Sequence, residues 1–276
     1  MKITLKLMSL TALFVASSVF AEVPCKFSES EKSFEGTRTE QAECLLRPVL
    51  RFAKLGKQQK LPDLLWSKID KDKVDITATE FKSYLNAYQI SESDIGGPIA
   101  KPLNLETRYF IIHDTSYNQG AKPFPSNADT TWSGNDLSKA KKVAHVFINR
   151  RGESVTKVDF SENYRTTKFE NQKISRRNMF VSVELIQPRR SYPEGSNTND
   201  AIAPTPGFTE QQLTRLAVIY FASSIRAGHY LIPAYHAVLD AGIPDGHDDP
   251  QNFDLARFDI ILDRVLFDIR GGPDAP

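Results

Sequence analysis

Two histidines and an aspartate are spaced so that they could hold a hydrolytic metal ion. His113 ends an apolar run that starts at Tyr109, and His236 follows a second apolar run, residues 231–235. Asp249 comes shortly after His236, directly before a proline. Two imidazoles and one carboxylate fill three tetrahedral positions of a zinc ion and leave the fourth for water, as in catalytic zinc sites. Such separations also arise by chance, so the residue types alone raise the hypothesis of a zinc hydrolase without establishing it.

The third ligand of this set has two rivals next to it in the chain. Asp248 would be the ligand if the loop shifts by one residue, and His247 could bind the metal instead. Asp249 is favoured because a residue before proline is held extended, which fixes the direction of a short carboxylate.

Glu184 is a carboxylate inside an otherwise apolar strand pattern, residues 180–185. Burying a carboxylate is costly unless it is paired or functional. We therefore expect a catalytic role for Glu184, with a structural ion pair as the alternative. His145 lies within another predicted strand, and we expect it to be a core residue or to support the site.

Alternating strands and helices in the second half of the chain must position these side chains. Thr209 has the capping-box spacing to Gln212 and predicts the start of a helix, and an apolar stripe over residues 258–269 predicts another. Short apolar runs predict strands at residues 109–112, 143–148, 154–158, 180–185 and 230–234. The alternation predicts an α/β fold.

The preceding part of the chain, residues 22–100, contains no histidine and is rich in Lys and Glu. Thr37 and Thr77 each stand three residues before a Glu, which predicts two capped helices, and Pro48 is expected to start or kink a third. Basic residues recur every three or four positions from residue 47 to 60. Contact with an anionic cell-envelope polymer is one interpretation, and a solvated helix face is the commoner one.

The Gly- and Pro-containing segment 91–103 is the predicted linker between this region and the second half.

The first residues predict export. Lys2 and Lys6 precede an apolar stretch, residues 7–20, that ends in small residues, as in a secretory signal peptide over residues 1–21. The stretch is shorter than the roughly 20 apolar residues of a membrane-spanning helix, although an uncleaved anchor is the alternative. We expect a periplasmic or secreted protein with no integral membrane span after cleavage.

Cysteine usage and charge narrow the possibilities further. Cys25 and Cys44 are the only cysteines, and in an oxidising compartment we expect them to pair rather than to remain free thiols. The 276 residues carry 35 basic and 34 acidic side chains, and loss of Lys2 and Lys6 would leave 33 − 34 = −1. A near-zero charge excludes a general polyanion binder, so no nucleic-acid partner is expected.

The second half of the chain resembles the type 2 zinc amidases, which are N-acetylmuramoyl-L-alanine amidases whose fold is shared by the peptidoglycan recognition proteins. The resemblance spans about residues 105–266 and does not cover residues 22–100. The segments that carry it, in chain order, are Phe110–Thr115, Ala144–Glu153, Val181–Leu185, Phe208–Leu213, Ile232–His236 and His247–Phe258.

This resemblance implies a role for each matched residue. His113 and His236 match the two histidine ligands of Zn²⁺, and Asp249 matches the third ligand. Glu184 matches the acidic residue that many catalytic members use beside the attacking water. His247 stands where several members have a lysine that stabilises the transition state.

We therefore expect residues 101–276 to form a zinc amidase domain, a mixed central sheet flanked by helices, behind a small helical region at residues 22–100. The implied reaction is zinc-dependent hydrolysis of the amide between the lactyl group of N-acetylmuramic acid and L-alanine, in peptidoglycan or muropeptide fragments. Tyr235 and Gln251 stand where glycine is usual, which bears on substrate preference. The alternatives are a non-catalytic peptidoglycan-binding protein on the same fold and an amidase toxin delivered to rival cells.

Overall fold

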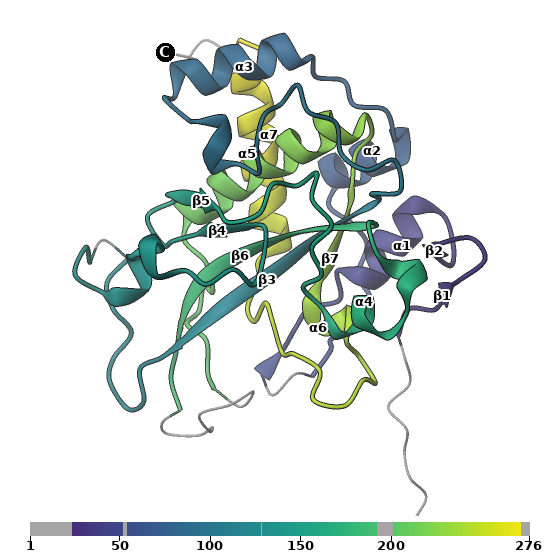
Figure 1. Cartoon of the computed structure of the whole chain (residues 1–276). Coiled ribbons are helices and arrows are strands. Elements are labelled where there is room, and N and C mark those ends of the chain that lie inside the picture. The colour runs from purple at the N-terminus through teal and green to yellow at the C-terminus, as the bar shows by residue number, and fades with distance from the viewer. Residues whose placement is uncertain (1–23, 52–53, 128, 192–200, 272–276) are drawn as a thin grey trace, which may run out of the picture.

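The computed structural model describes residues 24–51, 54–127, 129–191 and 201–271 (Figure 1). The expected signal peptide, residues 1–21, lies outside them. No helix in the described part of the chain is long and apolar enough to cross a membrane.

Within the described ranges, a mixed sheet of five strands forms the centre of the molecule, in the order β5-β4-β6-β3-β7. Its strands are β3 (Tyr109–Asn118), β4 (Val146–Ile148), β5 (Ser154–Thr156), β6 (Phe180–Arg189) and β7 (Ile232–Tyr235). β3 pairs in parallel with β6 and β7, β4 pairs in parallel with β6, and β4 and β5 form an antiparallel hairpin. Each strand overlaps a predicted run, so the α/β class and the mixed central sheet are confirmed.

The remaining elements surround this sheet. The α-helices are α1 (Arg38–Leu45), α2 (Asp63–Lys71), α3 (Ala78–Ala87), α4 (Lys168–Gln172), α5 (Glu210–Ala227), α6 (His236–Leu239) and α7 (Leu255–Ile269). A two-stranded ribbon, β1 (Phe27–Ser28) and β2 (Ser33–Phe34), precedes them. The 3₁₀ helices are η2 (Glu92–Asp94), η3 (Ser133–Asn135), η4 (Leu137–Lys139) and η5 (Ile174–Arg176).

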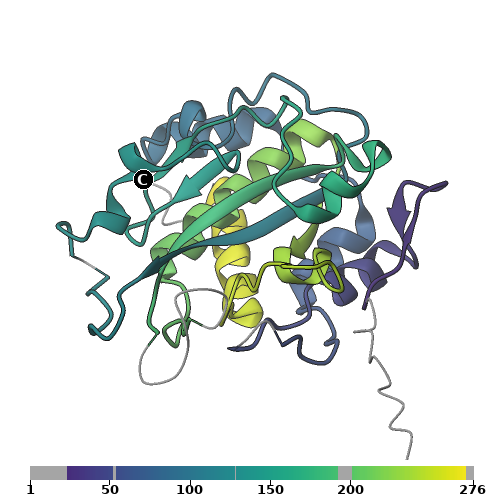
Figure 2. The same ribbon diagram turned by 60° about the horizontal axis from the view of Figure 1, so that its bottom comes forward.

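The long helices α5 and α7 lie side by side on one face of the sheet (Figures 1 and 2). α5 begins at Thr209, whose hydroxyl accepts a hydrogen bond from Gln212 N as the capping box predicts, and it ends at left-handed Gly228. Phe110 of β3 meets Tyr220 of α5 edge to face, with ring centroids 5.5 Å apart. This contact buries the even-numbered side chains of the first part of β3 against the helix pair.

The odd-numbered side chains of β3 point to the opposite face of the sheet. Tyr109 stacks on Phe180 of β6, with centroids 5.1 Å apart, and meets Phe34 of β2 at 5.4 Å. Phe169 of α4 packs on the same rings. Because side chains alternate along a strand, His113 also opens on this face, away from α5 and α7.

The helix expected at Pro48 is wrong, because no α-helix forms among the described residues between α1 and α2. Backbone donors in this segment bond to carbonyls nearby in the loop, from Leu50 N to Lys54 O at 2.7 Å and from Gly56 N to Pro48 O at 2.7 Å. The basic residues from 47 to 60 therefore lie on a loop and not along one helix face.

The N-terminal helices share a continuous apolar core with the sheet. The hydroxyl of Tyr109 donates to Gln41 Oε1 at 2.9 Å and accepts from Phe34 N at 3.0 Å, which ties β3 to α1 and β2. The segment 91–103, predicted as a linker, is hydrogen-bonded to α5, because Arg226 Nε donates to Lys101 O at 2.8 Å. The two-domain division near residue 100 remains a prediction.

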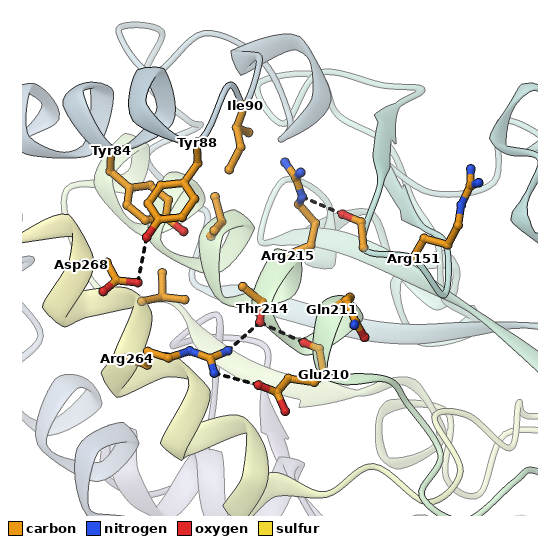
Figure 3. A pocket seen from close by; sticks show the side chains of 13 residues that line it. Tyr84, Tyr88, Ile90, Arg151, Glu210, Gln211, Thr214, Arg215, Arg264 and Asp268 are labelled. Carbon is orange, nitrogen blue, oxygen red and sulfur yellow. Dashed lines mark hydrogen bonds and ion pairs between the residues drawn. The ribbon is translucent and has the colours of Figure 1, made fainter. Parts of the chain in front are cut away.

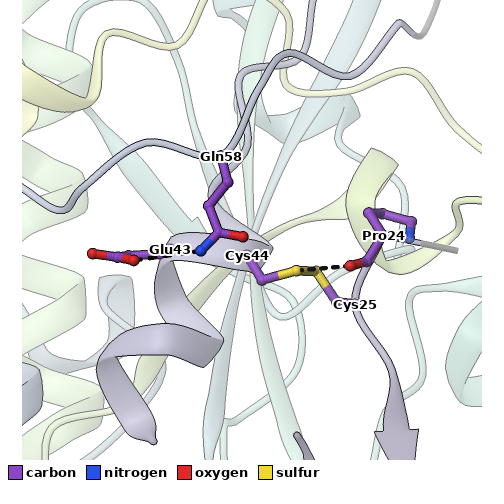
Figure 4. The surroundings of a disulfide bond; sticks show 5 residues. All are labelled: Pro24, Cys25, Glu43, Cys44 and Gln58. Carbon is purple, nitrogen blue, oxygen red and sulfur yellow. Dashed lines mark hydrogen bonds between the residues drawn. A yellow bond between two sulfur atoms is a disulfide. The ribbon is translucent and has the colours of Figure 1, made fainter. Parts of the chain in front are cut away.

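Cys25 and Cys44 form a disulfide, as expected, and it joins the segment before β1 to the last turn of α1 (Figure 4). The two cysteines are separated by 19 positions in the chain. A cross-link over such a loop stabilises a protein mainly by restricting the unfolded chain.

We expect the double substitution Cys25→Ser and Cys44→Ser to lower the free energy of unfolding by about 3 kcal/mol, because the loop is then open in the unfolded state. Urea unfolding of the oxidised protein, the reduced protein and the double variant measures the change. The reduced protein and the variant should agree, and an unchanged unfolding midpoint in both would contradict the expectation.

Candidate metal centre

His113, His236 and Asp249 converge on one buried point, although they come from three parts of the chain. One potential ligand atom from each lies within 4.8 Å of the others. His113 projects from β3, His236 begins α6 directly after β7, and Asp249 lies in the loop before α7. His113 Nδ1 lies 2.8 Å from His236 Nδ1, and His236 Nδ1 lies 3.1 Å from Asp249 Oδ1. This cluster could bind a metal ion.

The facing imidazole nitrogens are the observation that fits a cation here. Two unprotonated imidazole nitrogens 2.8 Å apart would repel each other through their lone pairs, so this contact fits a proton or a metal ion between the rings. Burial, together with the charge of His236, lowers the pKa of His113 well below its ordinary value, which favours the neutral form that binds metals. Burial opposes charge on His236, but Asp249 and Asp240 raise its pKa to about 10.

The outer nitrogen of each imidazole has its own partner. His236 Nε2 lies 3.0 Å from Asp240 Oδ2, and His113 Nε2 lies 3.2 Å from Thr166 Oγ1. Asp240 also accepts from Phe169 N at 2.9 Å, so it connects α6 with α4. Partners of this kind fix the orientation of a ligand imidazole and leave its inner nitrogen facing the metal.

A buried arginine, Arg189 at the end of β6, holds the loop that carries Asp249. Its Nη2 donates to Asp114 Oδ2 at 2.7 Å, and its Nη1 donates to Asp248 Oδ2 at 3.3 Å. The backbone N–H of Asp114 in turn donates to Asp249 Oδ2 at 3.0 Å. Asp248, the rival ligand, is thus paired with Arg189, while Asp249 faces the two histidines.

His247, the other rival, lies at the rim of the cluster. Its side chain is 56 % exposed, and its Nδ1 lies 3.5 Å from Asp249 Oδ1. Its ring lies against that of His236, with centroids 4.3 Å apart. The structure therefore places it beside the cluster and open to solvent.

Glu184 lies next to the cluster because the parallel register of β3 and β6 pairs it with His113. Its Oε1 lies 3.9 Å from His113 Nδ1, and its Oε2 accepts a hydrogen bond from Thr115 Oγ1 at 2.8 Å. Burial and the neighbouring charge of Asp249 raise the pKa of Glu184 to about 8. The carboxyl group can therefore hold and release a proton beside the cluster.

Sequence reasoning missed four residues of this site: Thr115, Thr166, Arg189 and Asp240. Asp240 caps α6 four residues after His236, and Thr115 follows His113 by two on a strand, so both share a face with a candidate ligand. These two spacings could have identified them. Arg189 and Thr166 carry no such local signal.

His145 and two aromatic residues of the segment after β3 lie outside the cluster. His145 is buried, with its Nδ1 2.9 Å from Ser182 Oγ. Trp132 is buried against the ring of Tyr117, with centroids 5.7 Å apart, and Phe124 lies under the guanidinium of Arg190. Packing contacts thus account for both aromatic side chains.

Comparison of the chain with models of protein families, with curated proteins and with solved structures finds no match.

With Zn²⁺ as the probe metal for the candidate site, we expect Asp240→Asn to weaken binding by about 10-fold or more, because His236 loses the carboxylate that orients its ring. Competition with a chromophoric chelator measures the zinc affinity. Asp245→Asn is the matched control, because this side chain is 96 % exposed and lies in the following loop. Equal zinc affinities of the two variants would contradict the role given to Asp240.

We also expect the free energy of unfolding to rise with pH between about 4 and 6.5 through His145, whose pKa burial lowers from 6.5 to about 4. The unfolded chain binds this proton more tightly. The contribution of His145 to the free energy of unfolding is therefore complete above pH 6.5 and is lost as pH falls toward 4. The full effect is about 3 kcal/mol.

Urea unfolding of the wild type and of His145→Gln across this pH range isolates the contribution, because all other groups titrate in both proteins. The wild type should show the steeper dependence on pH. Identical slopes would show that His145 keeps an ordinary pKa in the folded protein.

Proposed function

We propose that this protein is a zinc-dependent amidase that hydrolyses the bond between the lactyl group of N-acetylmuramic acid and L-alanine, in peptidoglycan or its muropeptide fragments. The convergence of His113, His236 and Asp249 with Glu184 beside them carries the proposal. The resemblance of the same segments to the type 2 zinc amidases supplies the substrate class, and the mixed five-stranded sheet is compatible with that fold.

The donor set supports zinc as the metal. Two imidazole nitrogens and one carboxylate oxygen, all buried, are the ligand types of hydrolytic zinc sites. When bound, zinc would lower the pKa of a water molecule and polarise the substrate carbonyl.

Glu184 is the proposed general base and acid. Its Oε1 lies 3.9 Å from the inner nitrogen of His113, so with a metal bound the carboxylate would be near the water to be deprotonated. Thr115 donates to Oε2 and holds the group in this orientation. Glu184 would then pass the proton to the leaving amine of L-alanine.

His247 is the proposed donor to the developing oxyanion. Its exposed ring is fixed against His236 at the rim, where a substrate carbonyl would enter. A donor placed at this point lowers the energy of the tetrahedral transition state. Unlike a lysine, an imidazole can do so without carrying a charge.

Export fits this function. The disulfide between Cys25 and Cys44 supports a location in an oxidising compartment, the periplasm or the outside of the cell. Peptidoglycan is reached there, and the expected signal peptide would deliver the chain.

We expect Glu184→Gln to lower the turnover of muropeptides by about 100-fold or more while zinc content stays at one per chain, because the proton acceptor is lost and the ligands remain. Mass spectrometry of released stem peptides measures activity, and elemental analysis measures zinc. Glu153→Gln, an exposed change on the β4–β5 hairpin, is the control and should keep both.

Retained activity in Glu184→Gln would refute the role of Glu184. A wild-type protein that binds muropeptides without cleaving them, with or without added zinc, would instead favour the non-catalytic peptidoglycan-binding protein.

A further inference from the structure

A cavity lies on the far side of the sheet from the metal cluster. It has a volume of about 520 Å³ and is bounded by α3, α5, α7 and the turn between β4 and β5 (Figure 3). His113 points away from α5, whereas this cavity lies on the outer side of α5, so the two sites are separate. Its volume is within the range of small-molecule sites.

Arg215 is the cation without a carboxylate partner among the described residues that line this cavity. Its Nε donates to Gly152 O at 2.9 Å, and no described carboxylate lies within ion-pair distance of its guanidinium. The other two lining arginines are neutralised, because Arg264 pairs with Glu210 at 2.7 Å and Arg151 pairs with Glu153 at 2.5 Å.

The guanidinium of Arg215 is also partly withdrawn from water. The side chain is half-buried, and this burial lowers its pKa below the ordinary value even though Asp94 and Glu153 lie in the vicinity. In Figure 3 its tip extends into the space between Ile90 and Arg151. A partly desolvated guanidinium with free N–H groups binds an anion favourably, in bidentate geometry.

The opposite wall of the cavity offers a surface for a ring. Tyr84 and Tyr88 of the α3 region pack with ring centroids 4.4 Å apart, and the Tyr88 hydroxyl donates to Asp268 Oδ2 at 3.3 Å. Gln211 and Thr214 on α5 lie between this wall and Arg151. The Thr214 hydroxyl already donates to Glu210 O at 2.9 Å and accepts from Arg264 at 3.0 Å, so the Gln211 amide is the group that can bond to a ligand hydroxyl.

We infer that this cavity binds a small sugar acid, whose carboxylate pairs with Arg215 and whose ring packs toward Tyr88. A single negative charge fits better than a phosphate dianion, because Arg215 is the one cation without a carboxylate partner among the described lining residues, and Asp268 also lines the cavity. The inference does not depend on the amidase proposal.

The test uses the full mature chain with its metal removed by chelator, so that the metal cluster cannot hold the probe. N-acetylmuramic acid is the probe, and N-acetylglucosamine is its matched control, since the two differ by the lactyl group that carries the carboxylate. Calorimetry should show binding of the first and not of the second. Inorganic phosphate and benzoate complete the set and should both bind more weakly than N-acetylmuramic acid.

Two variants locate the bound probe. Arg215→Met should weaken binding by about 10-fold or more. Arg215→Lys should weaken it less, because lysine keeps the positive charge and loses only the paired N–H donors of the guanidinium. Arg108→Met, an exposed change outside the cavity with the same loss of charge, should bind as the wild type does. Circular dichroism verifies that each variant is folded.

Absent binding of N-acetylmuramic acid, or equal binding by Arg215→Met and the wild type, would overturn the inference. Stronger binding of phosphate or benzoate would overturn the assignment to a sugar acid. Because zinc is absent throughout, none of these results depends on whether the protein cleaves muropeptides.

Discussion

The parallel register between β3 and β6 is the constraint on which the metal centre depends. It runs over ten residue pairs and places His113 directly beside Glu184. Because side chains alternate, a slip of one residue would turn Glu184 toward α5 and bring an apolar neighbour to the cluster. The rings of Tyr109 and Phe180, which stack at the start of both strands, hold the register on the same face.

The metal centre also depends on charge balance, because three buried aspartates lie at or next to it. Arg189 is the cation that pairs with Asp114 and Asp248. Asp249 follows Asp248 directly in the chain and accepts a hydrogen bond from the backbone of Asp114. Removing one partner of such a buried group is costly, since the remaining charge has no water to solvate it. Because Arg189 pairs with Asp248, Asp249 is the aspartate that faces the two histidines.

The sequence predicted the features that depend on local patterns. Short apolar runs predicted the strands. The capping-box spacing of Thr209 and Gln212 predicted where α5 begins. The three candidate ligands were found from residue types and from the family resemblance, and the structure brings them together. That they bind zinc stays a prediction.

Long-range contacts explain what the sequence could not predict. The loop after Pro48 is held partly by a backbone bond from Asn252 N to Val49 O at 3.4 Å, between residues far apart in the chain. Arg189 likewise pairs with Asp114 across 75 positions. No spacing within a single segment indicates such a partner. The N-terminal region also contacts the edge strand of the sheet. Lys73 forms a bridge with His229 and Asp72 O accepts from Tyr230 N, just before β7, and α1 packs on β7 itself. Because an uncovered edge strand can pair with other chains, these contacts shield part of the sheet that would otherwise be open to such pairing.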